Sequence, residues 1–179
     1  MKETKVESQL KYQGKILDLR VDQVLLPNGK HANREVVLHH GSVAIVAVTS
    51  KNEVILVKQY RYPVNDVLWE IPAGKLEKDE NPDECARREL AEETGFGATN
   101  WLKISTFFST PGFSDEIMYL YLAQELFAEK LESDDDEFIE IHKIPYTEAV
   151  DKIVKGEIRD AKTIAGVLLV EKIINGEVR

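Results

Sequence analysis

Residues 74–96 read Gly-Lys-Leu-Glu-Lys-Asp-Glu-Asn-Pro-Asp-Glu-Cys-Ala-Arg-Arg-Glu-Leu-Ala-Glu-Glu-Thr-Gly-Phe. Eight carboxylates fall in this stretch, together with only four basic residues. Asn81 and Pro82 occur in the order that suits an N-cap and the first turn of a helix, and Gly95 suits a left-handed C-cap. The pattern therefore predicts a helix over residues 82–94.

Three glutamates of this predicted helix share one face. Glu89, Glu92 and Glu93 are separated by three and four residues, and Arg88 lies one turn before Glu92. Like charges at this spacing each cost about 0.2–0.5 kcal/mol, so a sequence optimised only for helix stability would avoid them. A solvated acidic helix is the ordinary interpretation of such a cluster. Crowded hard oxygen ligands, however, also suit Mg2+ or Mn2+.

The spacing of the whole stretch favours the metal site over the solvated helix. The stretch resembles the signature of the Nudix hydrolases at each of its fixed positions: Gly74, Glu80, Arg88, Glu89, the apolar Leu90, Glu92, Glu93, Gly95 and the apolar Phe96. So many defined positions at fixed spacings rarely coincide by chance. The resemblance implies hydrolysis of a nucleoside diphosphate linked to another moiety.

Length, charge and cysteine content restrict the class of protein. A chain of 179 residues with 43% apolar composition suffices for one well-filled core. The net charge of -9 argues against nucleic acid or an anionic membrane as a partner. We expect a cytoplasmic protein, because the first ten residues are charged and no apolar run approaches membrane-spanning length. Cys85 is the single cysteine, and we expect it to be buried rather than nucleophilic.

Apolar runs on both sides of the acidic helix predict strands. The predicted strands cover residues 16–26, 34–38, 43–48, 54–59, 101–108, 117–123 and 138–144, and further helices are predicted over residues 147–155 and 160–174. Strands and helices do not alternate regularly, which favours an α+β fold in which helices flank a mixed β-sheet. The Nudix resemblance implies the same arrangement, an α/β/α sandwich.

Residues 1–42 precede the part of the chain, about residues 43–144, that resembles the Nudix core. We interpret them as an N-terminal antiparallel strand extension and residues 43–179 as the catalytic domain. The edges of such an extension must be paired or covered. The ADP-ribose pyrophosphatases, which this chain resembles more narrowly, exchange a sheet of this kind across a homodimer, where it helps to bind the adenosine. The resemblance therefore implies a domain-swapped homodimer.

Features outside the acidic stretch bear on the substrate. Pro111 follows Phe96 by fifteen residues, where the ADP-ribose pyrophosphatases carry a marker proline, although Pro-Gly also makes an ordinary turn. Three further features resemble that subgroup: residues 59–62 followed by residues 69–74, residues 134–137 and residues 160–163. The resemblance implies hydrolysis of ADP-ribose to AMP and ribose 5-phosphate.

The resemblance also implies roles in metal binding and catalysis. The implied ligands of two or three Mg2+ or Mn2+ ions are Glu89, Glu93, Glu137 and the Ala73 carbonyl. Glu92 would support the cluster, Arg88 would orient the glutamates, and Glu80 would tie the preceding loop to the helix. The general base would be Asp135 or Glu137. Relatives commonly carry glutamate where Asp135 stands, and the acidic run around it is most simply a solvated loop, so the identity of the base stays open.

The implied substrate contacts are Arg34, Arg61, Glu70, Pro111, Gly112 and Glu116. Arginine matches phosphate oxygens bidentately, which favours a diphosphate contact for Arg34 and Arg61 over a role as ordinary strand-end cations. Glu70 and Glu116 could equally be surface salt-bridge partners. His39 and His40 are adjacent on a predicted strand and would point to opposite faces, so they cannot readily share a metal ion.

Two alternatives remain at this point. The substrate could be another nucleoside diphosphate derivative, such as a nucleotide sugar, NADH or a dinucleoside polyphosphate. The chain could also be a non-catalytic module that binds ADP-ribose as a regulatory ligand. Every glutamate of the signature is present, which argues against the second alternative.

Overall fold

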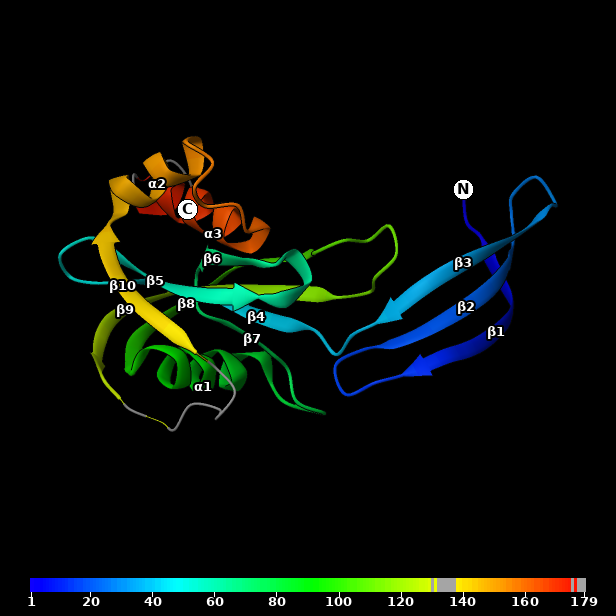
Figure 1. Cartoon of the computed structure of the whole chain (residues 1–179), viewed down its shortest axis with the longest axis horizontal. Helices are drawn as coiled ribbons and strands as arrows, with labels where there is room; N and C mark the ends of the chain where they lie inside the picture. The colour runs from blue at the N-terminus through cyan, green and yellow to red at the C-terminus, as the bar shows by residue number, and fades with distance from the viewer. Residues whose placement is uncertain (130, 132–137, 175, 177–179) are drawn as a thin grey trace. The chain divides into compact units, whose positions relative to one another are not determined.

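The structure is a computed structural model that describes residues 1–129, 131, 138–174 and 176 (Figure 1). The chain forms two compact units. The first contains Met1–Gly41 and Phe107–Met118, and the second contains Ser42–Thr106 and Tyr119–Arg179.

The first unit is a three-stranded antiparallel sheet in the order β1-β2-β3. Its strands are β1 (Thr4–Gln13), β2 (Asp18–Leu25) and β3 (His31–Leu38). The turn between β2 and β3 contains Gly29, whose φ of 81° lies in the left-handed region that glycine tolerates. Strand β1 was not predicted from the sequence, because Val6, Leu10 and Tyr12 are its only large apolar side chains. All ten of its residues are exposed.

The segment Phe107–Met118 belongs to the first unit because it is bonded to β3. Val37 N donates to Phe113 O at 2.8 Å, and Asp115 N donates to Val37 O at 3.2 Å. Ser114 forms an isolated parallel bridge with Val37. These bonds fix the loop that carries Pro111 to the end of the N-terminal sheet.

The second unit contains a seven-stranded sheet in the order β10-β5-β4-β9-β8, with β6 paired to β5 and β7 paired to β4. Its strands are β4 (Ser42–Val48), β5 (Glu53–Arg61), β6 (Asp66–Glu70), β7 (Ala73–Lys75), β8 (Phe96–Phe108), β9 (Ile117–Ala128) and β10 (Ile139–Pro145). The short strands β6 and β7 were not predicted, and a 3-10 turn, η1 (Tyr62–Val64), joins β5 to β6.

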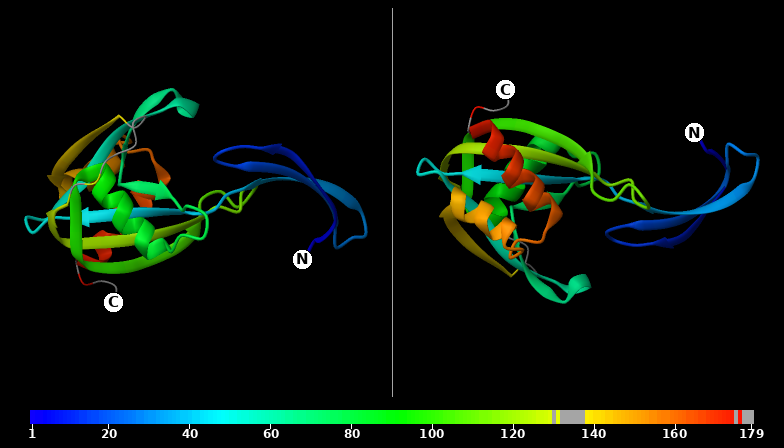
Figure 2. Two further views of the ribbon diagram at one scale, coloured as in Figure 1. Left: turned by 90° about the horizontal axis from the view of Figure 1, so that it is seen from below. Right: turned by 90° about the horizontal axis from the view of Figure 1, so that it is seen from above.

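Helices cover both faces of this sheet. Helix α1 (Pro82–Thr94) lies on one face, and α2 (Tyr146–Val154) and α3 (Ala161–Ile174) lie on the other (Figures 1 and 2). The predicted α+β fold, a mixed sheet flanked by helices in an α/β/α sandwich, is confirmed. None of the described helices is both long and apolar enough to cross a membrane.

Strand β4 is the centre of the core, because all seven of its residues are buried. Towards α1, Val43, Ile45 and Ala47 belong to the same apolar cluster as Ala86 and Leu90. A strand that is buried on both faces reads as a continuous apolar run, which is how residues 43–48 appear in the sequence. The position of α1 against β4 is therefore fixed by hydrophobic burial on its inner face.

The ends of α1 follow the predicted capping residues. Asn81 Oδ1 accepts a hydrogen bond from Asp83 N at 2.8 Å, and Pro82 occupies the first turn. At the other end Gly95 has φ 72°, and its N–H donates to Ala91 O at 2.9 Å. The helix accordingly runs from Pro82 to Thr94, as the sequence predicts.

Candidate active site

Helix α1 carries two buried carboxylates one turn apart. Glu89 and Glu93 are 8% and 5% exposed, respectively. Ala73 N donates to Glu93 Oε2 at 3.1 Å. A Cβ atom added to Gly74 would lie 1.9 Å from the carboxyl carbon of Glu89, so only glycine permits this approach. Strand β7 thus brings its backbone directly against the two carboxylates.

Arg88 binds three of the neighbouring glutamates. Its Nη1 lies 2.8 Å from Glu92 Oε2 and 2.9 Å from Glu89 Oε1. Its Nε and Nη2 donate to the two carboxylate oxygens of Glu80 at 3.0 and 3.1 Å. Glu80 Oε2 also accepts from Glu77 N at 2.9 Å, which ties the preceding loop to the helix.

These contacts shift the ionisation of the pair formed by Arg88 and Glu80. The hydrogen bond to Glu80 raises the pKa of Arg88 above its ordinary value, against the opposing effect of burial. The same hydrogen bond lowers the pKa of Glu80. Both groups are therefore charged at neutral pH, and Arg88 is a fixed counter-ion for the acidic cluster.

A divalent metal ion fits the donor set at Glu89 and Glu93. Two buried carboxylates beside the backbone of Ala73 offer the hard oxygen donors that Mg2+ and Mn2+ prefer. Within the described part of the chain, no three His, Cys, Asp or Glu side chains converge closely enough to hold a metal. Glu137, the third predicted carboxylate ligand, and Asp135 lie outside the described residues.

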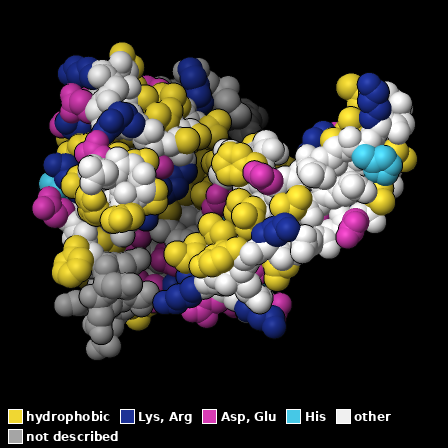
Figure 3. Space-filling view, turned by 45° about the vertical axis from the view of Figure 1, so that its right-hand side comes forward, with side chains coloured by type: hydrophobic (Ala, Val, Ile, Leu, Met, Phe, Trp, Pro, Cys, Tyr) yellow, Lys and Arg dark blue, Asp and Glu magenta, His cyan; other side chains and the backbone are white. Residues whose placement is uncertain are grey.

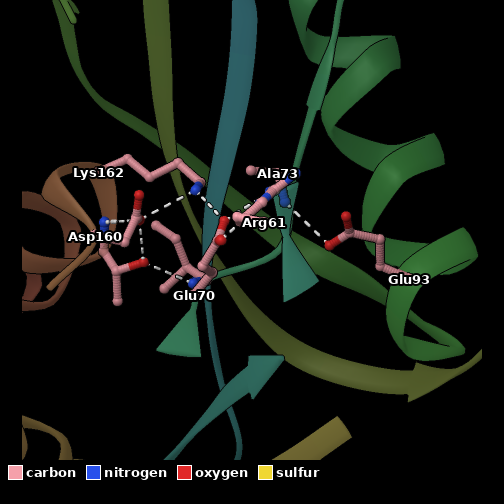
Figure 4. A network of polar contacts seen from close by, with 8 residues as sticks. Arg61, Glu70, Ala73, Glu93, Asp160 and Lys162 are labelled. Atoms are coloured by element: carbon pink, nitrogen blue, oxygen red, sulfur yellow. Dashed lines mark hydrogen bonds and ion pairs between the residues drawn. The ribbon is translucent and has the colours of Figure 1, made fainter. Parts of the chain in front are cut away.

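A second polar cluster joins the ends of β5 and β6 to α3 (Figure 4). Arg61 Nε and Nη2 donate to the two carboxylate oxygens of Glu70, both at 2.7 Å. Lys162 Nζ also donates to Glu70 Oε2 and lies 3.1 Å from Asp160 Oδ2. Glu70 is 1% exposed. Burial alone would raise the pKa of Glu70, but Arg61 and Lys162 together lower it below its ordinary value.

Hydrogen bonds fix the N-terminal end of α3 to this cluster. Asp160 Oδ2 accepts from Thr163 N at 3.0 Å and from Thr163 Oγ1 at 2.6 Å. Thr163 Oγ1 in turn accepts from Ile71 N at 2.9 Å, in a buried position. Lys162 was not predicted as a site residue. The sequence signal that points to it is the string Asp-Ala-Lys-Thr at residues 160–163, which resembles the ADP-ribose pyrophosphatases.

The remaining predicted residues lie in the first unit. Arg34 donates from Nε and Nη2 to the carboxylate of Glu3, at 3.0 and 2.6 Å. Glu116 Oε2 accepts from Ser109 Oγ at 2.5 Å, and its Oε1 lies 3.7 Å from His39 Nδ1.

Pro111 and Gly112 form the tip of a turn in the same unit. Ser114 N donates to Thr110 O at 3.1 Å across this turn. No atom lies within 4 Å of a Cβ added to Gly112 in the described structure, so close packing does not explain this glycine.

Comparison with known proteins agrees with this geometry. The model of the NUDIX domain matches residues 38–167, which include all of α1 and strands β4 to β10. The chain belongs to the Nudix hydrolase family. The preceding residues 3–37 match the nucleoside diphosphate sugar hydrolase N-terminal domain. The family predicted from residues 74–96 is therefore confirmed.

Relatives of this Nudix hydrolase match nearly its whole length. An ADP-ribose pyrophosphatase of Bacillus subtilis (strain 168) is 46% identical, over 91% of this chain and 89% of that protein. A methanol dehydrogenase activator of Bacillus methanolicus is 40% identical, over 92% and 90%. The crystal structure of an ADP compounds hydrolase covers 100% of this chain and 97% of its own, with a TM-score of 0.87 at 22% identity. This last match supports the fold alone.

Proposed function

We propose that this Nudix hydrolase cleaves the diphosphate of ADP-ribose with one water molecule, giving AMP and ribose 5-phosphate. The observation that carries the proposal is the near full-length match to the Bacillus subtilis ADP-ribose pyrophosphatase at 46% identity. The buried pair Glu89 and Glu93 against Gly74 supports it, because a diphosphate needs divalent cations to offset its charge.

We propose that four groups together bind two or three metal ions: Glu89, Glu93, Glu137 and the Ala73 carbonyl. Mg2+ or Mn2+ bound there supplies an activated water and neutralises the diphosphate. Arg88 holds Glu89 and Glu92 in place through its short contacts to both. We propose Asp135 or Glu137 as the base that accepts the proton of the attacking water.

We propose substrate contacts from residues in each of the two units. Arg61 uses Nε and Nη2 on Glu70, so its remaining Nη1 group can donate to a phosphate oxygen. In the first unit we propose contacts from Arg34, Pro111, Gly112 and Glu116. Arg34 would exchange its exposed ion pair with Glu3 for the diphosphate, which costs little because exposed ion pairs contribute little to stability.

We further propose that the protein acts as a homodimer in which the N-terminal sheet reaches the partner's site. Apolar side chains are exposed on the first unit (Figure 3), among them Val6, Leu10, Tyr12, Ile16, Leu17 and Leu25. A three-stranded sheet with so many exposed apolar side chains is typical of a surface that is covered in the assembled protein. The cytoplasmic location expected from the sequence stays a prediction.

Two observations favour either a different nucleoside diphosphate substrate or a regulatory role. The N-terminal model is described for nucleoside diphosphate sugar hydrolases, and a 40% identical relative is a methanol dehydrogenase activator. A substrate panel separates these possibilities from ADP-ribose hydrolysis. The panel contains ADP-ribose, nucleotide sugars, NADH and a dinucleoside polyphosphate, each tested with Mg2+ and with Mn2+.

We expect ADP-ribose to give the highest kcat/KM, with AMP and ribose 5-phosphate identified by chromatography and mass spectrometry. Reaction in 18O-labelled water would show which phosphorus is attacked. If another compound gave a kcat/KM at least tenfold higher, a difference of roughly 1.4 kcal/mol, that compound and not ADP-ribose would be the preferred substrate. Tight binding of ADP-ribose without turnover would instead support a regulatory module.

A further inference from the structure

The buried Glu70 carboxylate is shared by two cations that reach it from different elements. Arg61 approaches from the side of α1 and Glu93, and Lys162 approaches from α3 (Figure 4). The Lys162 side chain is 13% exposed, whereas that of Arg61 is 39% exposed. Lys162 is therefore enclosed in the cluster, and Arg61 is the member that remains accessible to a ligand.

The contact with Glu70 fixes the orientation of the Arg61 guanidinium. Both Nε and Nη2 are bonded to the carboxylate, so the plane of the guanidinium is set by Glu70. Glu93, one of the two buried glutamates of α1, also interacts with the charge of Arg61. Arg61 thus lies between the carboxylate that holds it and the carboxylates that would bind metal.

Lys162 changes the net charge that this cluster presents. Arg61 and Lys162 balance the carboxylates of Glu70 and Asp160. Without the Lys162 ammonium, the two carboxylates of Glu70 and Asp160 would face a single cation, Arg61. The cluster would then carry one net negative charge. A diphosphate approaching Arg61 would then meet a more negative site, in a partly buried position where screening by salt is weak.

We infer that Lys162 is a positioning residue for substrate binding: by neutralising Glu70 from the α3 side, it keeps Arg61 oriented and electrostatically available to the diphosphate. This inference rests on the proposed cleavage of a nucleoside diphosphate but not on the identity of the group attached to it. A merely structural Lys162 would tie α3 to the sheet, a task that Thr163 and Ile71 already perform.

The test compares Lys162→Met, Lys162→Arg and Lys155→Met in the full-length protein. Lys155→Met is the matched control, because it removes the same charge from an exposed position of the second unit. For Lys162→Met we expect KM for ADP-ribose to rise about tenfold or more, with kcat within about threefold of wild type. Lys162→Arg should restore most of the loss, and Lys155→Met should resemble the wild type.

Two further measurements keep the inference separate from folding and from the proposed substrate. Calorimetry of ADP-ribose binding without metal should show the same rise in Kd, and thermal unfolding should show that Lys162→Met remains folded. If the wild type prefers another nucleoside diphosphate, the proposed function fails, and the variants are compared on that compound instead. An unchanged KM and Kd in a folded Lys162→Met variant would overturn the inference, as would a loss confined to Tm or kcat.

Discussion

At the scale of single residues, the site depends on carboxylates that the fold has removed from water. Glu89 and Glu93 are buried, and the absence of a side chain at Gly74 lets the backbone of β7 approach Glu89. Arg88 contacts Glu89 and the Ala73 N–H donates to Glu93, yet the arrangement still holds two carboxylates close together in a buried position. A bound divalent cation would stabilise such a pair, which helix stability alone does not favour. The consequence for activity can be tested at Glu93.

We predict that Glu93→Gln lowers kcat by at least about a hundredfold, because catalysis at a metal-bound diphosphate is largely electrostatic. The amide keeps the shape of the side chain, so circular dichroism should show an intact fold. Glu84→Gln is the control, since it makes the same change at an exposed position of α1. Near-normal turnover of Glu93→Gln at saturating Mg2+ would refute its role as a metal ligand.

The ion pair between Arg88 and Glu80 predicts a dependence of stability on pH. Arg88 lowers the pKa of Glu80 below its ordinary value of 4.5. The stabilisation is therefore complete above pH 4.5 and is lost as the pH falls through the lowered pKa. Glu80→Gln should lower the free energy of unfolding at neutral pH by roughly 1 kcal/mol, since the pair is partly accessible to solvent.

The difference between wild type and Glu80→Gln should shrink as the pH falls below 4.5, because wild-type Glu80 also loses its charge. Urea unfolding at neutral and at acidic pH measures this difference. A difference that stays constant over the whole range would show that the carboxylate charge of Glu80 does not contribute.

At the scale of elements, close packing rather than helix propensity determines the position of α3. Gly166 lies in the middle of this helix, where alanine would ordinarily be favoured by about 1 kcal/mol. A Cβ atom at Gly166 would lie 2.9 Å from Val46 Cγ2 and 3.0 Å from Ile71 Cδ1. Both neighbours are buried, so they cannot move aside into solvent.

We predict that Gly166→Ala destabilises the protein by about 1–3 kcal/mol, as overpacking of a well-filled core does. Chemical unfolding measures the loss. Shortening the neighbour in the double variant Gly166→Ala with Val46→Ala should cost less than the sum of the single variants. A stabilised Gly166→Ala variant would mean that helix propensity outweighs the packing at this position.

At the scale of the whole molecule, the N-terminal sheet has too little buried surface to be explained as an independent structure. Every residue of β1 is exposed, and sheets of this size need a further apolar surface for stability. We predict that the wild type is a dimer in light scattering and that Val6→Glu with Leu10→Glu shifts it to a monomer, because new charges would be buried in the interface.

Lys5→Glu is the matched control for this double variant, since it makes the same change in net charge on the same strand. It should remain dimeric. If the partner's sheet contributes to substrate binding, the monomeric variant should also show a raised KM for ADP-ribose. A wild type that is monomeric and fully active would refute the proposed assembly.

Those parts of the protein that depend on local rules were predictable from the amino-acid sequence. The start and end of α1 were predicted to the residue, because capping and helical spacing involve neighbours along the chain. The continuous apolar run of β4 and the mixture of strands and helices likewise predicted the fold class. Helical spacing likewise predicted that Glu89 and Glu93 lie on one face of α1.

Contacts between residues far apart in the sequence became known only from the folded chain. Strands β1, β6 and β7 were missed, because each is defined by its pairing with a neighbouring strand, and β1 and β7 in addition carry few large apolar side chains. Lys162 and Glu70 are 92 residues apart, and the pairing of Arg34 with Glu3 was equally invisible in the sequence. The physical reason is that electrostatic contacts depend on distance and burial, which packing creates and which residue spacing cannot specify.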